Sequence, residues 1–262
     1  MSVGAVARAH ESELDASILD ASRVAVIATR WPPDPWLDEL VDAIERGRFT
    51  LPRTTLRGVS LAEVTAWLER TVPRDVVSTR TRDALISDLL DQVHRQEALW
   101  GSTRFVVRVL VEAPSRRCGF HVDTVPRGAP AWGLLRVYNG RGPSWVDPRD
   151  VTSMRAFYDW LAVRDRIVRD HADVELRDAR LRAHDEDLSF LAPGASVHEL
   201  PAGTTVAFRH LEAHLHWSDH EPQRAWIHSS PMAGRPRLVV NVSSDGPVTL
   251  RPQGAGSADP RP

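Results

Sequence analysis

The sequence predicts a mixed α+β fold in which a barrel of short strands follows a mainly helical N-terminal region. Two observations lead to this prediction. Apolar residues recur at helical spacing through most of the first hundred positions, whereas short β-branched runs separated by Gly and Pro turns fill most of the rest. The strand-rich part is roughly 160 residues long, a length that suits one jelly-roll or cupin-like double-stranded β-helix.

In the N-terminal third, one strand-like run precedes three amphipathic stretches. Residues 23–30 are rich in Val, Ile and Ala and end before a Trp-Pro-Pro turn, which indicates a strand. Residues 34–44, 60–68 and 81–98 carry Leu, Val, Ile and Trp three and four positions apart. That spacing places the apolar side chains on one helical face, so we expect three helices here.

Beyond residue 100 the pattern changes to short strands with one helical insert. We expect strands at residues 104–113, 132–140, 144–146, 195–200, 204–210, 225–230 and 237–242, with a further one at 248–252. Aromatic and aliphatic residues at helical spacing predict a helix at about 150–170. The charged segment 171–187 is expected to be a loop or a weak helix. We therefore divide the chain into a helical region 1–100, a barrel domain 101–252 and a disordered tail 253–262.

The composition excludes several classes of function. The chain has 262 residues and a net charge of −2, so no basic surplus points to nucleic acid. All 33 basic residues are Arg, which removes lysine as a Schiff-base former. The one cysteine, Cys118, permits no internal disulfide, and no apolar run is long enough for a membrane span. With no secretory pattern at its start, we expect a cytoplasmic protein.

Three separated residues form a candidate metal-binding set. His121 and Asp123 are two positions apart in a segment expected to be extended, so both side chains project to the same face. His228, on a later strand, supplies a second imidazole. Two histidines and one carboxylate occupy one face of an octahedron and leave positions open, as in non-haem Fe(II) oxygenases. Zinc is an alternative, because the same donors with a water also suit that ion.

Arginines near these residues are candidates for binding a co-substrate. Arg237 comes nine residues after His228 at the head of an aliphatic strand, from which its guanidinium can bind a carboxylate through two parallel hydrogen bonds. Arg235 is a competitor, although Pro236 separates it from the strand. Arg136 alternates with apolar neighbours, so it either faces the barrel and binds co-substrate or points outward.

Three passages resemble the DUF1826 family, a bacterial family of uncharacterised function. They read FHVDTVP, LLRVYNGRGPSWV and IHSSP followed by RL, and the resemblance spans roughly residues 23–245. The chain departs from the family pattern at Ser229, at the turn around Gly142 and in its Leu-Leu-Arg order. His121, Asp123 and His228 are retained.

More distantly, the layout is similar to the Fe(II)/2-oxoglutarate oxygenase superfamily. That resemblance implies Fe(II) held by His121, Asp123 and His228, 2-oxoglutarate gripped by Arg237, O₂ as oxidant, and a small-molecule or amino-acid-like substrate. Two alternatives remain open: a metal-binding protein without oxygenase activity, and a regulatory or scaffold domain that binds a small acid. The histidine-rich tract 210–220 is either a solvated loop or a second metal site, and Cys118 is expected to be a packed small residue.

Overall fold

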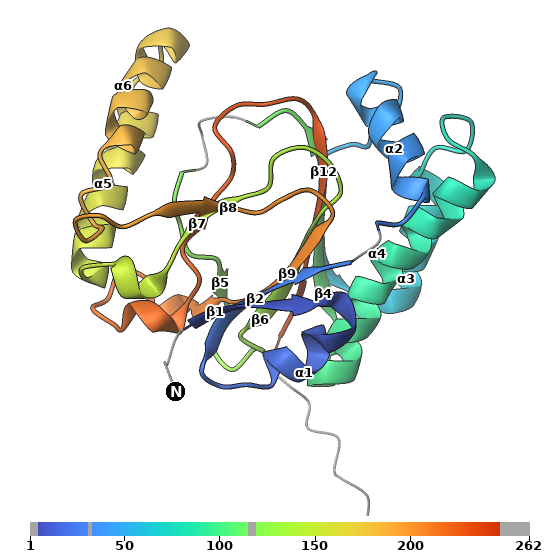
Figure 1. Ribbon diagram of the computed structural model, residues 1–262, viewed down its shortest axis with the longest axis horizontal. Helices are drawn as coiled ribbons and strands as arrows, with labels where there is room; N and C mark the ends of the chain where they lie inside the picture. Colours follow the sequence, from blue (N-terminus) through green and yellow to red (C-terminus); the bar gives the residue numbers. More distant parts are fainter. Residues whose placement is uncertain (1–4, 31–32, 115–118, 247–262) are drawn as a thin grey trace, which may run out of the picture.

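The computed structural model describes residues 5–30, 33–114 and 119–246, and its largest element is a seven-stranded sheet in the order β1-β2-β9-β6-β12-β4-β3 (Figure 1). The strands are β1 (Ala5–His10), β2 (Arg23–Thr29), β3 (Thr54–Val59), β4 (Phe105–Glu112), β6 (Trp132–Val137), β9 (Thr204–Arg209) and β12 (Arg237–Ser244). Neighbouring strands are antiparallel, except that β1 and β2 run parallel. The molecule is therefore a mixed α+β protein built on one large sheet.

Two small sheets face one end of the large one. The three-stranded sheet has the order β11-β7-β8, and β10 pairs with β5. Their bounds are β5 (Thr124–Val125), β7 (Ser144–Val146), β8 (Val197–Glu199), β10 (Leu211–Glu212) and β11 (His228–Ser229). Trp145 of β7 and Trp226, just before β11, are buried in one apolar cluster with Phe208 of β9. This cluster joins the small sheet to the inner face of the large sheet.

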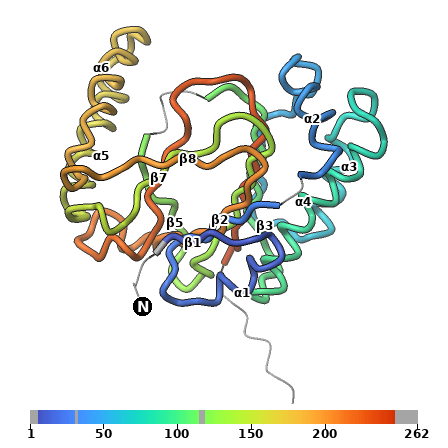
Figure 2. Tube along the Cα trace, in the orientation of Figure 1, coloured from blue at the N-terminus to red at the C-terminus, as the bar shows by residue number. Residues whose placement is uncertain are grey.

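Helices cover the outer face of the large sheet and the outer face of the three-stranded sheet (Figures 1 and 2). Their bounds are α1 (Leu14–Ile18), α2 (Trp36–Glu45), α3 (Leu61–Thr71), α4 (Thr79–Trp100), α5 (Met154–Asp170) and α6 (Val174–Glu186), with 3₁₀ turns η1 (Glu11–Glu13), η2 (Pro148–Asp150), η3 (Ala213–Leu215) and η4 (Pro222–Arg224). Helices α2, α3 and α4 pack on β4 and β12, whereas α5 packs behind the small sheet. The large sheet and the three-stranded sheet thus lie between two layers of helices.

Strand alternation decides which side chains reach the space between the sheets. On β12, Leu238, Val240 and Val242 pack against the helices, so Val239 and Asn241 point the other way. On β4, Val107 and Val109 likewise face the helices. The large sheet is consequently apolar toward its helices, and its inner face is left for binding.

The structure agrees with most expected elements. The edge strands β1 and β3 and the two-residue strands β5 and β10 were not expected, and of the two alternatives for the charged segment 171–187, a loop or a weak helix, the structure has the helix α6. Strands β1, β2 and β3, all from the first hundred residues, join the large sheet. Cys118, the expected strand 248–252 and the tail 253–262 lie outside the described residues. In the described part of the chain, no helix has the length and apolarity needed to cross a bilayer.

Candidate metal centre

His121, Asp123 and His228 converge at the edge of the small sheet. One potential ligand atom from each lies within 4.8 Å of the others. The Nε2 atom of His121 is 3.8 Å from Oδ1 of Asp123, and Nε2 of His228 is 3.9 Å from Oδ2 of the same carboxylate. These spacings allow one ion to be bound by all three groups, and the described residues contain no second cluster of this kind.

The backbone holds the two imidazoles together. His121 and His228 form an antiparallel bridge in which each amide donates to the other's carbonyl, at 2.8 and 3.1 Å. Residues paired in this way point their side chains to the same face of a sheet. The ring centroids are accordingly 4.5 Å apart. The chain therefore positions both histidines through main-chain hydrogen bonds rather than through the ion.

The other nitrogen of each ring is directed to a carbonyl. Nδ1 of His121 is 2.7 Å from the carbonyl oxygen of Gly119, and Nδ1 of His228 is 3.3 Å from that of Trp226. A carbonyl only accepts, so in each ring Nδ1 carries the proton and Nε2 keeps its lone pair. Metal-binding histidines are oriented in this way.

Burial and charge keep Asp123 and His228 in their metal-binding protonation states. Burial, together with the neighbouring His121, lowers the pKa of His228 to about 3. Burial alone would raise the pKa of Asp123, but the attraction of His228, His121, His210 and Arg108 outweighs it and lowers that pKa to about 2. At neutral pH the site therefore offers a carboxylate and a neutral imidazole from His228.

His210 is a third imidazole beside this carboxylate. It is 4% exposed, and neither of its ring nitrogens has a hydrogen-bond partner among the described residues. Its Nε2 lies 4.0 Å from Oδ2 of Asp123. Gly133 makes room for the ring, because a Cβ at that position would lie 2.4 Å from it. His210 thus belongs to the surroundings of the metal centre, a placement that its position in a histidine-rich tract did not reveal.

Arg237 lines the same cavity as the three candidate ligands. The cavity has a volume of about 570 Å³ and opens between β3, β4 and β12 on one side and the metal centre on the other. Arg237 is 7% exposed, and one of its nitrogens donates to the carbonyl of Arg141 at 2.8 Å. The structure therefore brings together four of the five predicted site residues.

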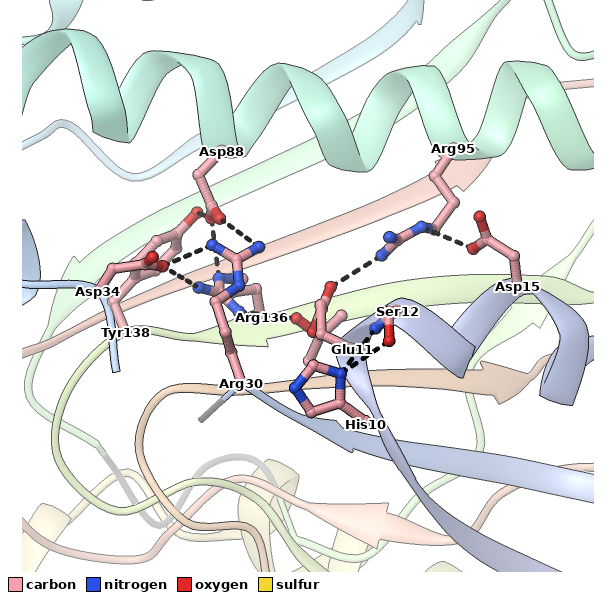
Figure 3. A network of polar contacts seen from close by, with 11 residues as sticks. His10, Glu11, Ser12, Asp15, Arg30, Asp34, Asp88, Arg95, Arg136 and Tyr138 are labelled. Atoms are coloured by element: carbon pink, nitrogen blue, oxygen red, sulfur yellow. Dashed lines mark hydrogen bonds and ion pairs between the residues drawn. The ribbon is translucent and has the colours of Figure 1, made fainter. Parts of the chain in front are cut away.

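Arg136 is the predicted residue that the structure places elsewhere. Its side chain leaves β6 on the outer face, where Nε lies 2.8 Å from Oδ2 of Asp88 on α4 (Figure 3). Tyr138 donates to the same carboxylate at 2.7 Å, and Arg136 also donates to Thr205. This buried network lies between the sheet and a helix, so Arg136 does not line the cavity.

The remaining candidates are also away from the metal centre. Arg235 is 77% exposed and pairs with Glu45. Within the histidine-rich tract, His216 and His220 lie against Tyr158 of α5, and His220 shares a hydrogen bond of 2.9 Å with the phenol. His214 is exposed near Glu212. The tract forms β10, a 3₁₀ turn and a loop rather than a helix, so its histidines do not share one face.

No protein-family model and no curated protein matches this chain, so the resemblance to the DUF1826 family remains a prediction. Similar solved structures are the Kdo hydroxylase KdoO, a non-haem Fe(II) α-ketoglutarate-dependent dioxygenase (13% identity, covering 92% of this chain and 89% of that one, TM-score 0.41), and a prolyl-4-hydroxylase from Pseudomonas putida (12%, 90% and 98%, 0.39). A third is the dioxygenase for auxin oxidation in rice (13%, 93% and 84%, 0.44). At such low similarity, the function of this chain has to follow from its own side chains.

Proposed function

We propose that this protein is an Fe(II)- and 2-oxoglutarate-dependent oxygenase that carries out a hydroxylation-type oxidation of a small molecule. The observation that carries the proposal is the convergence of His121, Asp123 and His228 at a cavity that Arg237 also lines. Two imidazoles and a carboxylate on one side leave the other coordination positions of an ion open. We also propose that the two facing sheets are the halves of a double-stranded β-helix.

Each residue has a defined role in this proposal. His121, Asp123 and His228 would hold the iron, and Arg237 would bind the far carboxylate of 2-oxoglutarate through paired hydrogen bonds. When bound, Fe(II) and 2-oxoglutarate supply O₂ activation coupled to decarboxylation of the keto acid. Because Arg237 is nearly buried, its attraction for a carboxylate is less screened by water than at the surface.

Apolar side chains protect one side of the metal centre. The His228 ring stacks on Trp226 with centroids 4.5 Å apart, and Phe208 meets it edge-on at 5.2 Å. Both neighbours are fully buried. They fix the orientation of the imidazole and exclude water from behind it, so solvent reaches the ion from the cavity side.

The test is anaerobic addition of Fe(II) and then 2-oxoglutarate to the purified protein. We expect a weak visible charge-transfer band when the keto acid chelates the iron, and succinate after O₂ is admitted. Arg237→Gln should weaken 2-oxoglutarate binding while leaving Fe(II) binding intact, and Arg235→Gln is the matched control because Arg235 lies outside the cavity. Tight zinc binding without any such band would instead favour a metal-binding protein with no oxygenase activity.

A further inference from the structure

One wall of the cavity is polar in a way that the metal and co-substrate do not explain. On the inner face of the large sheet, Thr55 of β3 lies opposite Arg108 of β4, and Arg108 lies opposite Asn241 of β12. All three side chains line the cavity, and Arg57 joins them two positions along β3 from Thr55. A hydroxyl, an amide and two guanidiniums therefore form a continuous hydrogen-bonding surface across three strands.

This surface has an excess of positive charge. The charged residues that line the cavity, apart from histidines, are Arg53, Arg57, Arg108, Arg237, Glu112 and Asp123. Glu112 already pairs with Arg53 at 2.7 Å. A divalent metal bound by Asp123, together with dianionic 2-oxoglutarate and Arg237, is electrically neutral. Two guanidinium charges remain, on Arg57 and Arg108.

Neither of these two arginines has a carboxylate of its own. Among the described residues, Arg57 makes no hydrogen bond or ion pair, and the one anionic neighbour of Arg108 is Asp123, at 3.9 Å from Nη1 to Oδ1. A metal ion would compete for that carboxylate. Arg108 is 43% exposed, so it is available to a molecule that enters the cavity.

We propose that Arg57 and Arg108 form the substrate-binding anion site of this cavity, and that the substrate is therefore an acid carrying a carboxylate or a phosphate. This inference rests on the proposed function, because it assigns Arg237 to the co-substrate. An acid held by the two guanidiniums, with Thr55 and Asn241 as further hydrogen-bonding groups, lies in the same cavity as Asp123 and the other candidate ligands. The planar guanidinium suits both anions, since each offers paired oxygens.

The experiment measures binding of charged and neutral probes to the anaerobic Fe(II)–2-oxoglutarate protein. Benzoate is compared with its neutral isostere benzamide, and phenyl phosphate is the phosphate probe. Binding is read from the change in the visible band and, independently, from the shift in melting temperature. The variants are the double substitution Arg57→Gln with Arg108→Gln, and the control Arg235→Gln, which removes an exposed arginine outside the cavity.

We expect the wild type to bind benzoate at least about tenfold more tightly than benzamide, and the double variant to lose most of that preference. The Arg235→Gln control should retain it. A stronger response to phenyl phosphate than to benzoate would identify a phosphate as the anion, and the reverse a carboxylate. Equal binding of benzoate and benzamide by the wild type, or an unchanged preference in the double variant, would overturn the inference.

The visible band separates this inference from the proposed function. If no band forms in any protein, the oxygenase proposal fails whatever the probes do. If the band forms in the wild type but not in the double variant, Arg57 and Arg108 hold 2-oxoglutarate itself, and the substrate site assigned here is wrong. A band of equal strength in both proteins leaves the probe comparison to decide.

Discussion

At the residue scale, Asp123 is surrounded by basic side chains: three imidazoles and one guanidinium lie within 4.0 Å of its carboxylate. It is the one anionic group among the three candidate ligands, and two neutral imidazoles alone bind a divalent cation weakly. Asp123→Asn keeps the shape but removes the charge. We expect it to weaken Fe(II) or Co(II) binding by more than the roughly 10–100-fold typical of outer-shell changes.

Isothermal titration with Co(II) measures this effect, and Glu112→Gln is the matched control. It makes the same carboxylate-to-amide change in the same cavity, but Glu112 pairs with Arg53 rather than joining the metal centre. Equal metal affinities for the two variants would contradict the assignment of Asp123.

The buried imidazoles predict how the stability of the metal-free protein depends on pH. Burial lowers the pKa of His228 to about 3 and also lowers the pKa of His210. An unfolded histidine has a pKa near 6.5, so between these values the unfolded chain binds more protons than the folded one. The free energy of unfolding should therefore be largest above pH 6.5 and should fall as the pH drops toward 3.

Each such histidine contributes at most about 1.4 kcal/mol per pH unit in that window. Urea denaturation at a series of pH values, with a chelator present, measures the slope. In His228→Gln the slope should be smaller than in the wild type. A free energy of unfolding that increases as the pH is lowered from 6.5 to 4 would contradict this account.

The sequence indicated the three residues that converge at the candidate metal centre, but not their neighbours. His121 and Asp123 could be found because alternation places residues two apart on one face, and His228 because it lies in a strand-like run. His210 was hidden in a histidine-rich tract, and nothing in that tract shows that the Leu211 amide donates to the Asp123 carbonyl at 2.8 Å. Such contacts depend on strand pairing between distant segments, which one sequence does not specify.

At the element scale, the contact between α4 and the large sheet includes a buried ion pair. Arg136 is 1% exposed and Asp88 is 5% exposed, and Tyr138 and Arg30 also contact this carboxylate (Figure 3). Burial raises the pKa of Asp88 in spite of Arg136. Asp88→Ala would leave the Arg136 guanidinium buried without its nearest partner, and we expect a loss of about 3–5 kcal/mol in the free energy of unfolding.

Chemical denaturation measures this loss, and the double variant Asp88→Leu with Arg136→Met is the informative comparison. It replaces both charges with apolar groups and should recover much of the stability. Metal affinity should be unchanged in the double variant, because this network lies on the outer face of the sheet. A double variant as unstable as Asp88→Ala would show that the pair does not account for the loss.

Elements with strong apolar patterns were predicted well, and edge elements were not. Strand β2 and helix α3 follow clear patterns, and α3 begins with a capping box between Ser60 and Glu63. Strand β3 has few buried positions, because it pairs on one side and carries Arg57 and Gly58. In helix α6 the one buried residue is Leu181, so its pattern carried almost no periodic signal. An element with few buried residues needs few apolar side chains, so its sequence shows little apolar periodicity.

Because β3 was not expected, the proposed anion site was not expected either. Thr55 and Arg57 alternate along β3, with Arg53 just before it, and the same alternation that identified His121 and Asp123 would have placed them on one face. The site could not be predicted because no element was expected at the residues that form β3.

At the scale of the whole molecule, metal binding should stabilise the fold. The ligands come from two segments more than a hundred positions apart in the chain, so the unfolded protein cannot present them together. With free metal at about 100 times its dissociation constant, the gain is about 2.7 kcal/mol. For a chain of this size that corresponds to a rise in melting temperature of roughly 5–10 °C.

Differential scanning calorimetry with Co(II), and again after addition of a chelator, measures this shift. Asp123→Asn should show little or no shift at the same metal concentration. A wild-type melting temperature that does not respond to any divalent cation would count against a metal centre.

The order of strands in the large sheet limits where the chain can be divided. Its two outer edges are formed by β1 and β3, both within the first 59 residues, whereas its central strands come from beyond residue 100. A fragment beginning at residue 101 would keep all three candidate metal ligands, yet it would expose unpaired backbone along β9 and β4. Unprotected strand edges of this kind recruit other chains. Truncating the chain to the segment that holds the candidate ligands would therefore produce an aggregating protein rather than a folded minimal domain.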